Sequence, residues 1–155
     1  MKNVKIIILA GLVLIITFAA FSPCLKNGFI NWDDDVYVID NPLIKDLSFQ
    51  GIAKIFTTIH SGLYKPLVFL SFSIEYHFFK LDPHIYHLTN IVFHLINSLL
   101  VFWLILILSD KPIIAFLVSF LFGIHPLHVE SVAWIAERKD TLYAFFYLGT
   151  LIFYL

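Results

Sequence analysis

Three adjacent carboxylates, Asp33, Asp34 and Asp35, follow Asn31 and Trp32 in the first third of the chain. Like charges this close repel one another, so the pKa of one carboxyl group rises unless a cation compensates. A carboxylate of that kind can act as a general base or bind a metal ion. The alternative is a solvated acidic turn, in which aspartate is common in any protein. Composition alone slightly favours that alternative.

A second group of chemically capable side chains is His125, His128 and Glu130. The two histidines are three residues apart, so on a helix they share a face, and Glu130 lies off that face. The HExxH pattern is absent and the spacing fits no common zinc motif. Proton transfer and hydrogen bonding to a polar ligand both remain open, and the alternative is ordinary helix capping around Pro126.

A third group runs from Glu137 to Asp140 and contains Arg138 and Lys139. A guanidinium offers a fork of N–H donors that matches phosphate oxygens, and an ammonium supplies a compact positive charge. The two cations therefore suit a lipid phosphate. Lys65 is a weaker candidate for the same role. The alternative is a solvated helix end whose charges only fix the membrane topology.

The amino-acid composition indicates the environment in which these three groups lie. Hydrophobic residues make up 60% of the 155 residues and charged residues only 14%, and mean hydropathy is +0.89. A soluble domain carries about 25% charged residues. The net charge of −1 gives no basis for a nucleic-acid partner. One cysteine excludes an internal disulfide. The sequence therefore predicts an integral membrane protein.

The first predicted crossing covers residues 4–22, since a spanning helix needs about 20 mostly apolar residues. Lys2 and Lys5 lie at its start, so the positive-inside rule puts the amino terminus in the cytoplasm. A cleaved signal peptide has a similar pattern. We favour a retained anchor because no small-residue cleavage site follows and the apolar run is long for a signal peptide.

Residues 83–108 form the clearest predicted crossing, which Pro83 begins. Its first half has a polar stripe with steps of 3, 3, 4 and 3, so the polar side chains share one face. Polar groups at membrane depth turn to the bundle or to a wet cavity. We interpret the two inner residues as helix–helix hydrogen-bonding groups and the three outer ones as candidates to line a site. In chain order these residues are His84, His87, Asn90, His94 and Asn97.

The third predicted crossing, 112–125, returns outward after a tight cytoplasmic turn. Its apolar core of twelve residues spans about 18 Å, well short of a bilayer core of about 30 Å. A second outer loop follows at 125–140, and a fourth crossing begins at residue 141. That crossing is incomplete at residue 155, so we expect an amino-terminal part of a longer protein.

The first outer loop, 23–82, is predicted to have structure of its own. Ser48 can cap a short amphipathic helix that runs to about His60. Another helix is expected from Pro66 to Phe79. It is too short to cross the bilayer and carries Glu75, so we place it along the membrane surface.

The predicted fold class is all-α integral membrane. We expect a multi-pass helical bundle of about four crossings, the last incomplete, with amphipathic interfacial helices in the first outer loop. All three charged clusters then lie on the outer side, at about headgroup depth and beside the polar stripe.

These motifs together resemble the GT-C superfamily of membrane glycosyltransferases, and in particular the transmembrane-and-tetratricopeptide-repeat O-mannosyltransferases and their bacterial relatives. The resemblance covers nearly the whole chain after residue 26, and the order of the motifs makes the set fairly specific. The motifs are Asn27-Gly28-Phe29, Trp32-Asp33-Asp34, Asn41-Pro42, Tyr64-Lys65-Pro66-Leu67, Tyr86-His87-Leu88-Thr89-Asn90 with His94 and Asn97, His125 to Val132, and Arg138-Lys139-Asp140.

The resemblance implies inverting transfer of a sugar from a polyprenyl-phosphate donor to a hydroxyl acceptor on the outer face, in the inner membrane of a bacterium. Asp33 or Asp34 would match the catalytic acid of the first outer loop, Glu130 an acidic position of the second, and Arg138 would stabilise the departing phosphate. Lys65 departs from the arginine expected there. The full set of expected substrate-binding residues is Arg138, Lys65, His87, His125, His128, Asp35 and Asp140.

The cofactor requirement is open. A divalent metal ion is compatible with the carboxylates but is not required, since a monophosphate leaving group needs less charge neutralisation than a pyrophosphate, and we assign no metal ligands. Two other classes stay in view. In a non-catalytic assembly or lipid-binding subunit the same clusters would only hold helices together. In a transporter fragment the polar stripe would line a permeation path.

Overall fold

The computed structural model of the protein describes residues 2–155, and for Lys2 the backbone alone. The described residues are helical throughout, apart from connecting turns and an isolated bridge between His60 and Leu63. Together with the apolar composition, this architecture confirms the predicted class of an all-α membrane protein.

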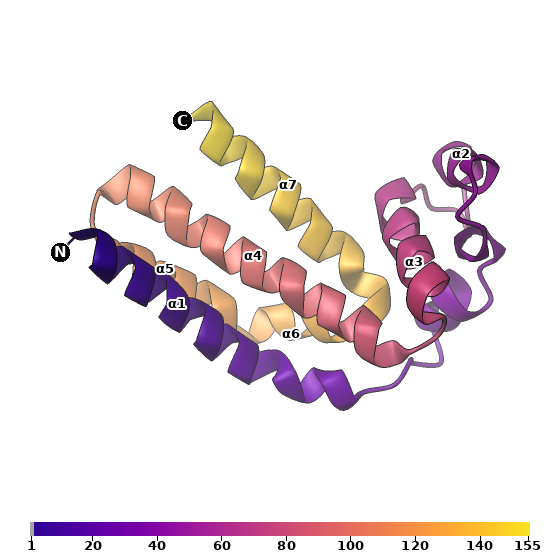
Figure 1. Cartoon of the computed structure of the whole chain (residues 1–155), viewed down its shortest axis with the longest axis horizontal. Coiled ribbons are helices and arrows are strands. Elements are labelled where there is room, and N and C mark those ends of the chain that lie inside the picture. The colour runs from indigo at the N-terminus through magenta and orange to yellow at the C-terminus, as the bar shows by residue number, and fades with distance from the viewer. Residues whose placement is uncertain (1) are drawn as a thin grey trace.

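Four helices run side by side along the length of the molecule (Figure 1). They are α1 (Lys2–Phe21), α4 (Pro83–Ser109), α5 (Pro112–Ile124) and α7 (Arg138–Tyr154). The amino terminus, the turn between α4 and α5 and residue 155 lie at one end, here called the inner end. The opposite end, here called the outer end, carries α2 (Phe49–Thr57), α3 (Pro66–Phe79) and α6 (Val129–Ala133).

Five short helical turns connect these elements at the outer end. They are η1 (Ser22–Lys26), η2 (Asp35–Ile39), η3 (Pro42–Lys45), η4 (Pro126–His128) and η5 (Ile135–Glu137). Four of them are 3₁₀ turns and η2 is a π-helical turn. The charged clusters of the sequence therefore fall on turns and helix starts, where side chains can point in several directions.

Local sequence signals account for most helix boundaries. Proline occupies the first position of α3, α4 and α5, where its missing N–H costs no helical hydrogen bond. The Oγ of Ser48 accepts a hydrogen bond from the Gly51 N–H, as predicted for this cap, although α2 ends at Thr57 and not near His60. The Oδ1 of Asp82 caps α4 by accepting from the N–H of His84.

Two helical stretches are long and apolar enough to cross a membrane, Asn3–Lys26 and Pro83–Ser109. A third candidate is a bent pair, Pro112–Ile124 with Pro126–Ala133, whose two halves meet at 49°. Counted as one broken span, the pair is longer than α5 alone, and counted as a re-entrant loop it does not cross. The fourth crossing, on α7, stays a prediction.

The inner half of the bundle is held by apolar packing, and its middle by close approach of small residues. Val13, Phe102 and Ala115 of α1, α4 and α5 form its buried cluster. A Cβ on Gly123 would overlap Thr17 Oγ1 and lie 3.3 Å from Ser98 Oγ. Glycine at this position therefore lets three helices meet.

The α3 helix has the predicted bounds but not the predicted polar face. Glu75 was expected at the membrane surface, yet it is 6% exposed and faces the protein. The reason is a partner far away in the chain: Glu75 forms an ion pair with Arg138 of α7. His77, on the same helix, is exposed.

Candidate functional site

The three aspartates of the first outer loop have different surroundings. Asp34 is fully buried, and its two carboxylate oxygens accept hydrogen bonds from the N–H groups of Ile30 and Ala136, both at 2.9 Å. Burial raises the pKa of Asp34, and these two hydrogen bonds oppose the rise. Asp33 and Asp35 are half-buried. Asp34 thus joins the two outer loops, and Asp33 and Asp35 are the accessible carboxylates.

Arg138 lies at the centre of a buried network. It is 0% exposed, and it donates hydrogen bonds to Asn90 Oδ1 at 2.8 Å, to Ser71 Oγ at 3.1 Å and to the Tyr86 carbonyl at 2.8 Å, as well as to Glu75. Its guanidinium also lies 4.4 Å from the centroid of the Phe72 ring. Four of its N–H bonds are thus used inside the protein, and the side chain does not reach a surface where a lipid phosphate could bind.

The polar stripe on α4 also makes contacts within the protein. The Nε2 of His94 lies 2.9 Å from the Gly123 carbonyl, and Asn97 Nδ2 donates to the Thr141 carbonyl at 2.8 Å. Both contacts join helices, as we predicted for the two inner residues. Farther out, His84 Nδ1 lies 3.1 Å from the Leu25 carbonyl and His87 Nε2 lies 3.5 Å from the Gly28 carbonyl. His87 is buried and packs α4 on the first outer loop.

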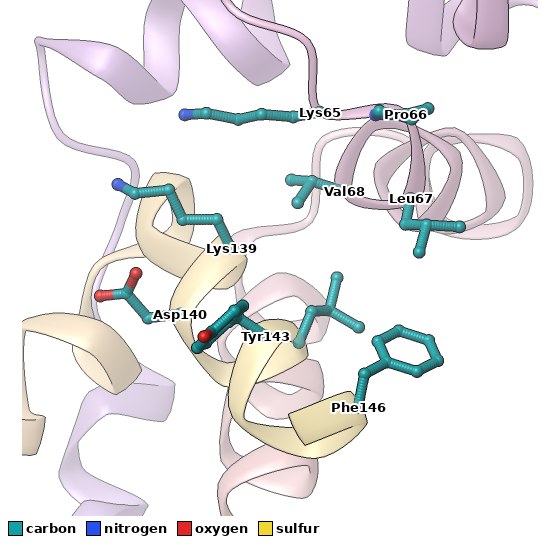
Figure 2. Close-up of a pocket in the computed structure, with 9 residues that line it drawn as sticks. Lys65, Pro66, Leu67, Val68, Lys139, Asp140, Tyr143 and Phe146 are labelled. Carbon is teal, nitrogen blue, oxygen red and sulfur yellow. The ribbon is translucent and has the colours of Figure 1, made fainter. Parts of the chain in front are cut away.

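A pocket of about 470 Å³ lies between the start of α3 and the start of α7. Figure 2 shows the ammonium groups of Lys65 and Lys139 at one end and Leu67, Val68 and Phe146 at the other. The lining is therefore cationic at one end and apolar at the other. The full lining is Lys65, Pro66, Leu67, Val68, Lys139, Asp140, Leu142, Tyr143 and Phe146.

Several charges surround the cationic end of this pocket. The Nζ of Lys65 lies 4.4 Å from the centroid of the Tyr37 ring, and Lys139 pairs with Glu137. Burial and the neighbouring Lys139 ammonium lower the pKa of Lys65, whereas the carboxylates of Glu137, Asp33 and Asp140 oppose that change. Asp33 is thus close enough to act on Lys65, and the site holds cations and carboxylates together.

His125, His128 and Glu130 of the second outer loop do not line this pocket. His125 is exposed, and its Nδ1 accepts a hydrogen bond from the Leu127 N–H at 3.2 Å, which is the capping role considered for it. His128 is half-buried, with its ring 4.6 Å from that of Phe122. It lines a second cavity, between α4, α5, α6 and α7. Glu130 is exposed on α6.

Within residues 2–155, no group of three or more histidine, cysteine, aspartate or glutamate side chains is placed to hold a metal ion. The charged residues that line the first pocket are instead two lysines, Lys65 and Lys139, and one carboxylate, Asp140. That excess of positive charge in the lining suits a ligand that carries its own negative charge.

Sequence reasoning considered both Arg138 and Lys139 for a lipid phosphate, and Arg138 in particular. Arg138 is buried, whereas Lys139 lines the pocket with its side chain 40% exposed. The pocket residues Tyr143 and Phe146 were missed. Their spacing of four and seven residues from Lys139 puts them on one helix face, and that signal could have found them.

The fold and the site define a class of protein: an all-helical membrane protein with a pocket at its outer end that is cationic at one side and apolar at the other. Among curated proteins, the chain is similar to a protein O-mannosyl-transferase of Caenorhabditis elegans. The two are 29% identical over 141 residues, which cover 83% of this chain and 20% of the relative. The chain thus spans about a fifth of the length of the curated relative that it matches. No protein-family model and no solved structure matches it.

Proposed function

We propose that the protein is a membrane glycosyltransferase that moves a sugar from a polyprenyl-phosphate donor to a hydroxyl acceptor at the outer side of the membrane. The pocket between α3 and α7 is the observation that carries the proposal, because its two ends match the two parts of such a donor. The similarity to an O-mannosyl-transferase supports the same class.

In this proposal Lys65 and Lys139 bind the donor phosphate. Hydrogen bonds between ammonium groups and phosphate oxygens are charge-assisted and therefore strong. The prenyl chain lies along Leu67, Leu142 and Phe146, which line the apolar end. Lysine at both positions gives charge without the fixed fork of arginine, so the phosphate can shift as the bond to the sugar breaks.

Asp33 is the proposed general base. It is half-buried and acts electrostatically on Lys65, whereas Asp34 is fully buried with both oxygens hydrogen-bonded to backbone N–H groups. Asp33 takes the proton from the acceptor hydroxyl as that oxygen attacks the anomeric carbon. The bond from that carbon to the phosphate oxygen breaks, and the anomeric configuration inverts. The two lysines stabilise the charge that develops on the phosphate.

The test is transfer of radiolabelled sugar from a mannosyl-phosphate polyprenol, in membranes that carry the whole protein encoded by the gene. Loss of a general base lowers the rate by about 10²–10⁴-fold. We expect a loss of that size in Asp33→Asn and little loss in Asp35→Asn, at equal protein levels. Equal transfer in the wild type and in Asp33→Asn would contradict the assignment of the base.

An assembly subunit is the second candidate, and one observation favours it. Asp34, Asn90 and Arg138 all direct their polar atoms into the protein, as they would in a part that only holds helices together. Absence of transfer with mannosyl, glucosyl and N-acetylglucosaminyl donors, from membranes in which the protein is folded, would favour this candidate.

A further inference from the structure

The second cavity lies on the other side of α7 from the pocket with the two lysines. It has a volume of about 180 Å³. Residues Lys139, Tyr143 and Phe146 line the first pocket, and Thr141 and Ala144 line the second cavity. Its full lining is His94, Asn97, Phe122, His128, Ser131, Val132, Asp140, Thr141 and Ala144.

The polar groups of the second cavity suit hydroxyl groups and not phosphates. Asn97 is 1% exposed, and its Oδ1 has no hydrogen-bond partner within the described chain. An unsatisfied buried acceptor costs about 1–3 kcal/mol, so a ligand hydroxyl that donates to it is favoured. Asp140 adds a carboxylate and Ser131 a hydroxyl, joined by a hydrogen bond of 2.9 Å. No lysine or arginine of residues 2–155 lines the cavity, so a phosphate there would meet only negative charge.

The rest of the lining is apolar or aromatic and comes from several elements. Phe122, Val132 and Ala144 offer carbon surface on α5, α6 and α7. A sugar ring presents C–H groups on its faces and hydroxyl groups on its edge. A small cavity with both kinds of lining therefore fits one uncharged sugar ring, and its volume is too small for a chain of several rings.

One residue connects the two cavities. Asp140 lines both of them. Successive residues of a helix are turned by about 100°, so Asp140 lies between the face that carries Lys139 and the face that carries Thr141.

We propose that the second cavity is the binding site for the sugar ring of the donor, with the phosphate on the lysine side of α7 and the link between them beside Asp140. This inference rests on the proposed function. The ring donates hydroxyl hydrogen bonds to Asn97 and Asp140 and packs its C–H groups on Phe122. The first pocket then selects for a lipid phosphate, and the second cavity selects for the sugar.

The test uses cysteine protection in the whole protein, reconstituted in lipid nanodiscs, in a background from which Cys24 and every other cysteine have been removed. Ala144→Cys reports on the second cavity, and Phe146→Cys is the matched reporter in the first pocket. Each variant is labelled with a small thiol reagent alone, with polyprenyl phosphate, or with mannosyl-phosphate polyprenol of the same chain length. Elution as a single folded species is required of both variants.

We expect both lipids to slow labelling of Phe146→Cys by roughly tenfold at saturating concentration, and only the mannosyl lipid to slow labelling of Ala144→Cys. Protection of Phe146→Cys combined with equal labelling of Ala144→Cys by the two lipids would overturn the sugar site and leave the proposed donor site standing. Absence of protection at Phe146→Cys would overturn the donor site, and the sugar site with it.

Discussion

The outer end and the middle of the bundle are held together by different kinds of contact. At the outer end, Arg138 joins α7 to α3 and α4 through hydrogen bonds and an ion pair. Midway along the bundle, Thr17, Ser98 and Gly123 bring α1, α4 and α5 together through close packing, without a charge. A charge is less costly where turns and backbone carbonyls can solvate it, so the charged network lies at the outer end. Because Arg138 ties α3 of the first outer loop to α4 and α7, we infer that the outer loops fold together with the bundle.

The largest expected effect comes from breaking the charged network. Arg138→Met leaves the carboxylate of Glu75 buried without its partner, which costs about 3–5 kcal/mol. We expect a large drop in the melting temperature of the purified protein in detergent, measured by loss of the monodisperse species after heating.

Two matched variants sharpen this prediction. Lys139→Met changes the neighbouring cation, which is 40% exposed, and should alter stability by no more than about 0.5 kcal/mol. The double variant Arg138→Met with Glu75→Leu removes both charges and should recover most of the loss. If Arg138→Met unfolds at the wild-type temperature, the network does not hold the outer end.

The next effect comes from overfilling the contact between α1, α4 and α5 midway along the bundle. Gly123→Ala places a methyl group against Thr17 Oγ1, and overpacking of this kind costs about 1–3 kcal/mol. Gly149→Ala is the control, because a Cβ there meets nothing within 4 Å. Adding Thr17→Ala to Gly123→Ala removes the clash and should restore the melting temperature. A Gly123→Ala variant that is as stable as Gly149→Ala would contradict the close approach of α1 and α5.

A smaller effect is expected from removing Lys139, which tests whether this side chain binds a ligand whereas Arg138 stabilises the fold. Lys139→Gln should weaken binding of polyprenyl phosphate by about tenfold, which corresponds to about 1.4 kcal/mol, and leave the melting temperature unchanged. Lys65→Gln should act in the same direction. Microscale thermophoresis in nanodiscs measures the affinity. Unchanged affinity in both variants would contradict a phosphate site in this pocket.

Much of this architecture could be predicted from the sequence because its signals are local. Prolines mark the starts of α3, α4 and α5, and the stripe spacing placed His94 and Asn97 at helix contacts. Such signals depend only on residues within one or two helical turns, so they can be read without knowing the tertiary contacts.

The rest depended on contacts between residues far apart in the chain. Arg138 and Lys139 are adjacent cations, and only the position of Glu75, 63 residues before Arg138, decides which of them is buried. In the same way, the hydrogen bond from the Ala136 N–H, 102 residues along the chain, distinguishes the buried Asp34 from its neighbour Asp33. No periodicity within a single segment contains that information.

The smallest predicted effect tests the burial of Asp34 through pH. Burial raises the pKa of Asp34 above its ordinary value of 3.8, so the folded state binds the proton more tightly than the unfolded state does. The contribution of Asp34 to stability is therefore fully present below about pH 3.8 and declines as pH rises through the raised pKa, by at most about 1.4 kcal/mol per pH unit. Asp34→Asn cannot titrate and should lose this slope, whereas Asp33→Asn should keep it. Melting temperatures between pH 3.5 and pH 7 measure the difference, and equal slopes in the two variants would place the titrating carboxylate elsewhere.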